Sequence, residues 1–301
     1  MSAISGTSKF HSTLQSYLEE VVRDHNVVSG DRIHLSIDLA ILGRCLRGLA
    51  TDAEEVTSTA LSFFRNHLGP KGTLLISCFS FDFSSFGAFS AAHSSVETGS
   101  FSKILFQQRP EARTLGPIYS FLAFGAEASK AFEARRNSTG ADSVFAMMID
   151  SNYKMLSIGH HVATAFTIAH YFEQLASVEY RYLKKIIGKL TLKDGTDSPW
   201  TTYLYVRGKG CEFSGLTSGG FQKLLKNKAA LAVVHQVKHD RIASFTVDLR
   251  AASVLIQEDF DSGGRNYIRP RMSEGKITGD MEPMSREISM DAYLSLISLG
   301  H

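Results

Sequence analysis

Two residues that could perform acid–base chemistry lie three positions apart in the mostly apolar stretch "TAFTIAHYFEQLASVEYRY" at 164–182. This stretch predicts a buried helix, on which His170 and Glu173 share one face, with Thr167 three residues earlier. A carboxylate that binds one ring nitrogen fixes the tautomer of an imidazole and makes the other nitrogen a general base. The same spacing is typical of a surface pair worth about 0.2–0.5 kcal/mol, and the spacing alone favours that second interpretation.

A metal site is the other chemistry that histidines in this region could support. The tripeptide "GHH" at 159–161 follows a predicted strand, and His160, His161 and His170 could serve a metal hydrolase. This set lacks the pair of histidines four apart that a helical zinc motif needs, and no further ligand is evident. We therefore predict no metal.

The composition is that of a globular protein and excludes several classes. The 301 residues are 44% hydrophobic and 21% charged, which is enough for a large buried core. Lys and Arg number 32 against 30 for Asp and Glu, without a dense basic stripe, so no nucleic-acid partner is expected. Three scattered cysteines do not make a disulfide framework. The absence of a leader or membrane-spanning run predicts a cytoplasmic protein without a membrane partner.

The elements that must position these residues alternate between helix and strand over the first 180 residues. A capping box, "TDAE" with Thr51 as the cap, opens a helix that ends at "GPKG" (69–72). The basic run "YRYLKKIIGK" (180–189) is interpreted as a solvated helix end. A long loop is expected at 80–99. Further helices are expected at 10–23, 100–108 and 127–136, and strands at 30–37, 73–79, 118–124 and 153–159.

The pattern changes after about residue 190. A strand at 201–210, a hairpin within 229–247 and helices at 249–258 and 288–299 are expected there. The prediction is an α/β fold with α/β/α layers around a mixed central sheet and a smaller α+β C-terminal subdomain. Residues 1–190 would form the core domain, and residues 191–301 the subdomain that packs on it.

Five sequence blocks, in the same order, resemble the aminoglycoside 3-N-acetyltransferases, a family of CoA-dependent antibiotic N-acetyltransferases. "TIAHYFE" (167–173) with "VEYR" (178–181) is similar to the family's T-x-L-H-x-x-E…PYR signature. The resemblance covers about residues 12–190 and is weaker beyond. The other blocks are "DRIHLSIDLAILGRCLRG" (31–48), "LGPKGTLLISCFSFDF" (68–83), "TGSFSKILFQQRPEARTLGPIYSFLAFG" (98–125) and "DSVFAMMIDSNYKMLSIG" (142–159).

The chain departs from the family pattern at two of these blocks. The family's H-P-x-H-S becomes Gly116-Pro117-Ile118-Tyr119-Ser120, so both histidines are replaced. Leu35 stands at the first serine of the family's H-S-S, while Ser36 keeps the second. These departures favour an acceptor that differs from an aminoglycoside, such as a free or nucleotide-linked amino sugar.

The resemblance implies direct transfer of an acetyl group from acetyl-CoA to a primary amine of an aminoglycoside or amino sugar. It makes His170 the general base and Glu173 the residue that orients it and raises its pKa. Contacts to the acetyl-CoA cofactor are expected from Ser36, Thr98, Gly99 and Ser120, and contacts to the substrate from Asp82 and Thr167. The alternative is a non-catalytic relative that binds a CoA-like ligand or a partner protein. A homodimer is also possible.

Overall fold

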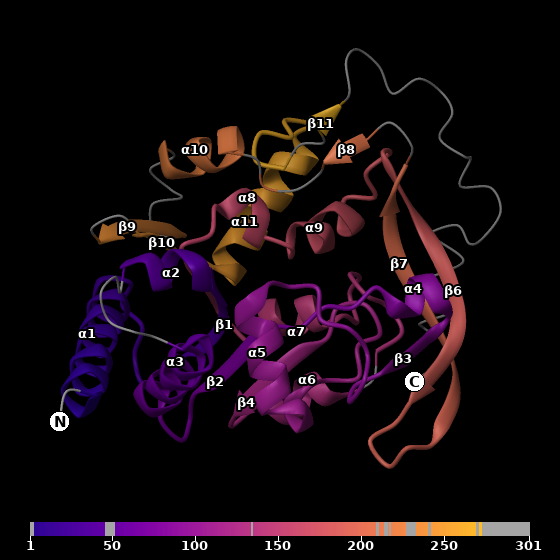
Figure 1. Cartoon of the computed structure of the whole chain (residues 1–301). Coiled ribbons are helices and arrows are strands. Elements are labelled where there is room, and N and C mark those ends of the chain that lie inside the picture. Colours follow the sequence, from indigo (N-terminus) through magenta and orange to yellow (C-terminus); the bar gives the residue numbers. More distant parts are fainter. Residues whose placement is uncertain are drawn as a thin grey trace.

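A six-stranded mixed sheet forms the centre of the computed structural model (Figure 1). The inner strand β1 runs parallel to both its neighbours, β2 and β5, whereas β4, β10 and β9 run antiparallel to theirs. The strand order is β4 (Phe121–Gly125), β2 (Thr73–Ser77), β1 (Arg32–Ile37), β5 (Lys154–Ile158), β10 (Ile242–Asp248) and β9 (Val234–His239). The structure describes residues 3–45, 52–133, 135–208, 211–213, 216, 218–226, 233–239, 242–268 and 271–272.

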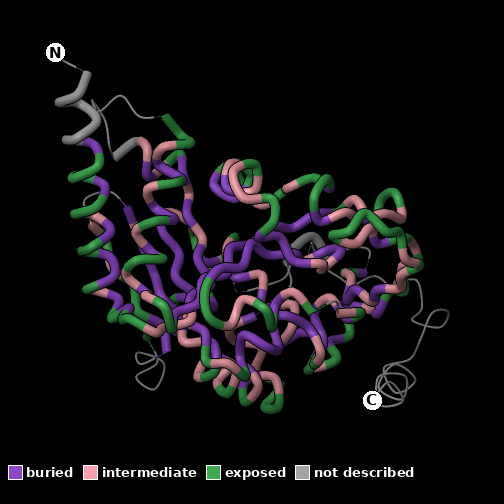
Figure 2. The backbone as a smooth tube through the Cα atoms, turned by 90° about the horizontal axis from the view of Figure 1, so that it is seen from below, coloured by how far each residue is buried: buried purple, intermediate pink, exposed green. Residues whose placement is uncertain are grey.

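Helices from the N-terminal part of the chain cover one face of this sheet. Apolar side chains at alternate positions of β1, such as Ile33 and Leu35, pack with Leu14, Phe64 and Leu105 from three of the helices. Figure 2 shows the buried strands between the half-exposed outer layers. The helices are α1 (Ala3–Asp24), α2 (Leu39–Cys45), α3 (Ala53–Leu68) and α5 (Ser100–Gln108).

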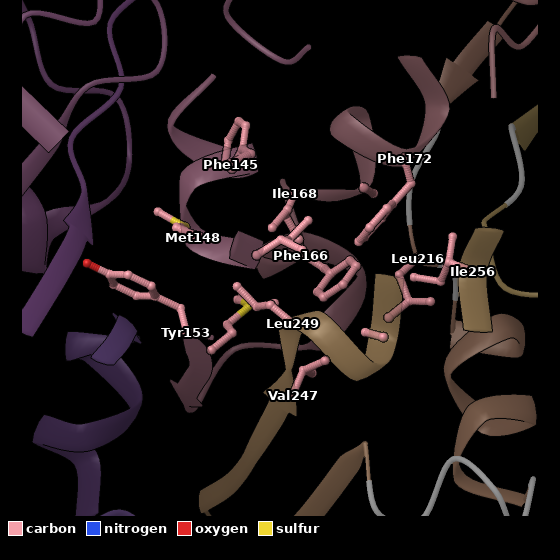
Figure 3. Packing of buried hydrophobic residues seen from close by; sticks show 14 of the residues in the cluster. Phe145, Met148, Tyr153, Phe166, Ile168, Phe172, Leu216, Val247, Leu249 and Ile256 are labelled. Carbon is pink, nitrogen blue, oxygen red and sulfur yellow. The ribbon is translucent and has the colours of Figure 1, made fainter. Parts of the chain in front are cut away.

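A second set of helices covers the opposite face. Here Met155 of β5 and Phe245 of β10 pack with Phe145 and Phe172 from the helices. Figure 3 shows Phe172 extending toward Phe166 in this layer, and their rings stack at 6.3 Å. The helices are α6 (Ala128–Phe132), α7 (Val144–Asp150), α8 (Val162–Ala165), α9 (Ala169–Leu175), α10 (Ser218–Lys226) and α11 (Leu249–Asp261).

A long β-hairpin beside the central sheet carries a second, three-stranded sheet (Figure 1). The backbones of Gly87 and Gly188 meet there, and a Cβ on Gly188 would lie 2.2 Å from the Gly87 oxygen. Only glycine permits this close approach. The elements are α4 (Asp82–Phe86), β3 (Ala88–Ser90), β6 (Arg181–Thr191) and β7 (Asp197–Arg207); a short 3₁₀ turn (Pro110–Ala112) and the pair β8 (Cys211–Phe213) and β11 (Arg271–Met272) complete the fold.

The predicted α/β class with a mixed central sheet is confirmed, and the strands and helices around it lie near their predicted positions. The helix α3 begins after Asp52, whose side chain accepts from the Glu54 amide, so the cap is Asp52 rather than the predicted Thr51, which lies outside the described residues. The predicted loop at 80–99 contains α4 and β3. The helix predicted at 288–299 also lies outside the described residues.

The prediction of one helix through 164–182 is wrong. The chain forms α8, a break at 166–168, the seven-residue α9, and then the strand β6 from Arg181. The basic run at 180–189 is therefore mainly strand, with Lys184 and Lys185 exposed, and not a helix end. Ser177 has a φ of 48°, a left-handed conformation that ends the helical path.

The boundary at residue 190 stays a prediction. Strands from the second part of the chain belong to the central sheet, because β10 pairs with β5 from Ser244 opposite Ile158 to Asp248 opposite Lys154. A division at this residue would therefore separate strands that share one hydrogen-bonded sheet.

Candidate active site

Helix α9 lies between α11 and the start of the β6–β7 hairpin (Figure 1). A helix of seven residues is unstable alone, so tertiary packing must hold it. Ala169 and Phe172 supply that packing, since both are buried in the second-face core. With these two side chains fixed in the core, His170 and Glu173 lie on an adjoining face of α9, directed toward the hairpin.

The structure brings His170 and Glu173 into direct contact. The Nδ1 atom of His170 lies 2.8 Å from Oε2 of Glu173. The Glu173 side chain is fully buried, whereas 21% of the His170 side chain is exposed. The carboxylate is thus shielded from water while the ring can be reached from outside. This arrangement suits a base that is oriented from behind.

Two residues at the start of the hairpin complete the surroundings of the carboxylate. The hydroxyl of Tyr180 donates to Oε1 of Glu173 at 3.0 Å. The guanidinium of Arg181 places Nε 2.7 Å from Oε2 and donates from Nη1 to the Tyr205 carbonyl at 2.8 Å. Sequence reasoning gave these residues no role, although "VEYR" is part of the block that resembles the family signature.

The electrostatics of the pair keep the carboxylate charged and the imidazole neutral. Burial raises the pKa of Glu173, but the hydrogen bond from His170 and the charge of Arg181 outweigh it, so this pKa lies below its ordinary value. Burial lowers the pKa of His170 below 6.5, and the charge of Arg181 adds to that effect. The contact with Glu173 raises the pKa of His170, but by less than burial and Arg181 lower it. The expectation that the pKa of His170 would rise is therefore wrong.

A row of hydroxyl groups lies at the carboxyl ends of the parallel strands. Ser36 of β1 is paired in register with Ser157 of β5. The hydroxyl of Thr98 donates to the carbonyl of Ser77 at the end of β2, at 2.8 Å. Ser36, Ser77 and Thr98 are half-buried, and Gly99, at the start of α5, is exposed. Ligands in open α/β sheets commonly bind at this edge.

Two other predicted contact residues are engaged in local structure. The Ser120 hydroxyl is buried, accepts from Nε of Arg113 at 3.0 Å and donates to the Cys78 carbonyl. This placement argues against its predicted contact with the cofactor. The carboxylate of Asp82 accepts from the amide and the hydroxyl of Ser95, each at 2.8 Å, and so ties a loop together.

Thr167 lies in the turn between α8 and α9, where its carbonyl accepts from the His170 amide at 3.1 Å. The turn therefore joins the predicted substrate-binding residue directly to the helix that carries the base. Thr167 is half-buried, which leaves part of it accessible to a ligand.

Two clefts among the described residues lie away from His170. One cleft of about 610 Å³ borders the end of α3, and one of about 370 Å³ borders Glu179 and Arg265. His170 lines neither.

Within the described ranges, no three His, Cys, Asp or Glu side chains are grouped to hold a metal ion. None of the described helices is both long and apolar enough to cross a bilayer.

The fold and this site define an α/β protein with a buried carboxylate that contacts a partly exposed histidine. The model of the aminoglycoside 3-N-acetyltransferase family matches residues 50–258. This match covers more than half of the chain, and the chain belongs to that family.

Solved structures confirm the fold at low sequence identity. Aminoglycoside acetyltransferase AAC(3)-Xa is 17% identical with a TM-score of 0.63, over 85% of this chain and 93% of that one. AAC-VIa bound to sisomicin is 20% identical with a TM-score of 0.63, over 83% and 97%. AAC-IIIb in a binary complex with CoASH is 18% identical with a TM-score of 0.64, over 84% and 96%. Among curated proteins, none matches the chain.

Proposed function

We propose that this protein transfers an acetyl group from acetyl-CoA to a primary amine of an aminoglycoside or an amino sugar. The observation that carries the proposal is the contact of His170 Nδ1 with Glu173 Oε2 at 2.8 Å, with the ring still partly exposed. Family membership supports it. So do two relatives with this fold, one bound to sisomicin and one to CoASH.

The chemistry explains why a histidine–carboxylate pair is useful here. An alkylammonium group with a pKa of about 10 cannot attack a thioester until it loses a proton. Nε2 of His170 takes that proton, and the free amine nitrogen then bonds to the acetyl carbon. The C–S bond breaks and the nitrogen gives up a second proton as the amide forms, so that one of the two protons passes to the leaving thiolate and the other to solvent. Glu173 balances the charge of the imidazolium in between.

The hydroxyl row at the sheet edge fits the acetyl-CoA that this reaction needs. The Ser157 hydroxyl is buried and has no hydrogen-bond partner among the described residues. Ser157 is the residue paired with Ser36 in the β1–β5 register. A thioester oxygen becomes negative during transfer and needs such donors. We assign Ser36, Thr98 and Gly99 to contacts with acetyl-CoA, and Asp82 and Thr167 to the amine substrate. Thr98 serves there as an acceptor, because its hydroxyl proton is donated to the Ser77 carbonyl. A homodimer and a cytoplasmic location stay predictions.

A panel of amines tests the proposed function directly. Thiol release from acetyl-CoA is measured with sisomicin, free glucosamine and a nucleotide-linked amino sugar, and without amine. Release that depends on the amine, with an acetylated amine found by mass spectrometry, is the expected result. Binding of acetyl-CoA without release for any amine would contradict transfer, and it would favour the second candidate.

That second candidate is a non-catalytic relative that binds a CoA-like ligand or a partner protein. It is favoured by the segment that departs from the family pattern. A Cβ on Gly116 would lie 2.6 Å from the Tyr119 oxygen, so this loop has no room for the family's histidine. Tyr119, at the other histidine position, packs against Phe79 and Phe145.

The pH dependence of the rate gives a second expected outcome. The base must be neutral, and the pKa of His170 lies below 6.5 because burial and Arg181 disfavour the charged ring. The acid limb of kcat/KM should therefore have its midpoint below 6.5, with a level rate at neutral pH and a loss as pH falls through the midpoint. Initial rates between about pH 4 and 8 measure it. A midpoint above the ordinary histidine value would contradict this assignment.

A further inference from the structure

One nitrogen of His170 lies close to two groups of opposite character. Nδ1 is 2.8 Å from the Glu173 carboxylate and 2.9 Å from Nη2 of Arg181. A carboxylate only accepts a hydrogen bond, and a guanidinium only donates. Nδ1 of a neutral ring can therefore bind one of them at a time. It binds Glu173 when it carries the proton and Arg181 when it does not.

These two arrangements differ in the nitrogen that remains for the substrate. When Nδ1 carries the proton and donates to Glu173, Nε2 has a free lone pair and can act as a base. When Nδ1 accepts from Arg181, the proton lies on Nε2 and the ring cannot take a proton from an amine. The balance between Glu173 and Arg181 therefore decides whether His170 is competent.

The burial of this cluster explains why Arg181 is nevertheless needed. Glu173 is fully buried and Arg181 is 5% exposed, with 2.7 Å between Oε2 and Nε. An ionised carboxylate without a counter-charge is strongly unfavourable at such a site, and it would protonate instead. A protonated Glu173 would be a weaker acceptor for the Nδ1 proton. The ion pair thus preserves the charge that holds the useful tautomer.

We propose that Arg181 is a positioning residue: it keeps Glu173 ionised, and through Glu173 it keeps the proton of neutral His170 on Nδ1, so that Nε2 is the free base. This inference rests on the proposed acetyl transfer. Arg181 acts through Glu173 and does not touch the substrate in this role.

Other charged and titratable groups face the same cluster and enter the expected pH profile. Arg207 of β7 lies directly opposite Arg181 in the hairpin register, and its charge also lowers the pKa of His170. The two arginines outnumber the one carboxylate, which favours the neutral ring. The groups around His170 are Glu173 on α9, Tyr180 and Arg181 at the start of β6, Arg207 on β7, and Tyr119 before β4.

The main test is the pH profile of Arg181→Met. Removal of this cation raises the pKa of both His170 and Glu173, because its positive charge disfavours the imidazolium and stabilises the carboxylate. The acid limb of kcat/KM should move up by about one pH unit or more, with at least about a tenfold loss at neutral pH. Arg181→Lys keeps the positive charge and should leave the limb near its wild-type position. A merely structural role would lower the rate of both variants without moving the limb.

A double variant tests whether Arg181 acts through Glu173. In Glu173→Gln, Arg181 becomes the dominant partner of Nδ1 and moves the proton to Nε2, so activity falls. Addition of Arg181→Met to this variant should cause no further loss of rate and should restore part of it. Multiplied losses in the double variant would overturn the proposal. Lys189→Gln, which removes a charge from an exposed ion pair on the same strand, is the matched control.

A measurement without substrate separates this inference from the proposed function. Long-range ¹H–¹⁵N spectra of protein with labelled histidine report the tautomer, and comparison with His170→Ala assigns the signal. We expect the Nδ1–H form in the wild type, and loss of that preference in Arg181→Met when circular dichroism shows a folded chain. An unchanged tautomer would overturn the inference even if transfer is active. Failure of the amine panel alone would overturn only the proposed transfer.

Discussion

Replacement of His170 with alanine should lower kcat/KM for the amine by about 10²–10⁴-fold at neutral pH. The variant loses the partly exposed imidazole of the cluster, while Glu173 keeps its ion pair with Arg181 and its hydrogen bond from Tyr180. The fold should therefore survive. Thiol release with the best amine of the panel measures the loss.

The pH profile of this variant distinguishes a lost base from a damaged site. Without His170, attack depends on the small fraction of amine that is already unprotonated, so the rate should rise about tenfold per pH unit below the amine pKa. His67→Ala is the matched control, since His67 on α3 is half-buried, stacks on Phe63 and contacts the Val27 carbonyl. Equal losses in both variants, or a His170→Ala profile like that of the wild type, would contradict the role of His170 as the base.

The regular elements could be predicted because their signals are local. Helix α5 matches the expected range 100–108, and α3 begins within two residues of its expected start because an acidic side chain caps it. The strand β2 is apolar and buried at its centre, residues 74–76, and lies between two neighbouring strands, as its sequence indicates. Helix caps and buried apolar runs involve residues that are close neighbours in the sequence, so the sequence alone can indicate them.

The stretch at 164–182 shows where local signals fail. The helical spacing holds only for α9, and beyond Ser177 the chain turns so that Arg181 can return to Glu173. The hairpin that imposes this turn pairs Arg181 with Arg207, a contact between residues far apart in sequence. Spacing within one helix could not reveal it, so tertiary pairing determined the structure there.

The candidate site was predictable in its centre but not in its surroundings. Contact between His170 and Glu173 follows from their spacing on any helix, and one turn suffices for it. The roles of Tyr180 and Arg181 depend on the course of β6, and sequence reasoning could not assign them. Ser120 was expected to face a ligand, yet its hydroxyl is occupied inside the protein by a residue from another segment, Arg113.

Replacement of Arg113 with methionine should cause the largest loss of stability, about 3 kcal/mol or more in the free energy of unfolding. The side chain is fully buried and donates to the carbonyls of Cys78, Ser94 and Ser95. Its guanidinium also lies 4.8 Å from the ring centre of Phe106. Methionine fills part of the space but removes one donor from each of these oxygens, and the Cys78 carbonyl keeps only the Ser120 hydroxyl. A buried oxygen left without a donor costs about 1–3 kcal/mol.

The same substitution at Arg109 provides the control. Arg109 is 40% exposed, forms an ion pair with Glu111 and lies over the ring of Phe124. Like Arg113 it contacts an aromatic ring, but it lies at the surface. Its loss should cost less than about 1 kcal/mol. Urea unfolding followed by circular dichroism compares the two variants. Equal midpoints would contradict the prediction, because they would mean that the buried carbonyls find other donors when Arg113 is absent.

The position of Arg113 also links this stability to the site. Its contacts with Ser94 and Ser95 hold the segment that leads to Thr98, whose hydroxyl is bonded to the end of β2. A variant that remains folded but loses these contacts should bind acetyl-CoA more weakly, whereas His170→Ala should bind it as the wild type does. Calorimetric titration with acetyl-CoA measures both. Unchanged binding in Arg113→Met would separate the segment at 94–98 from the cofactor and remove the support for Thr98 as a contact residue.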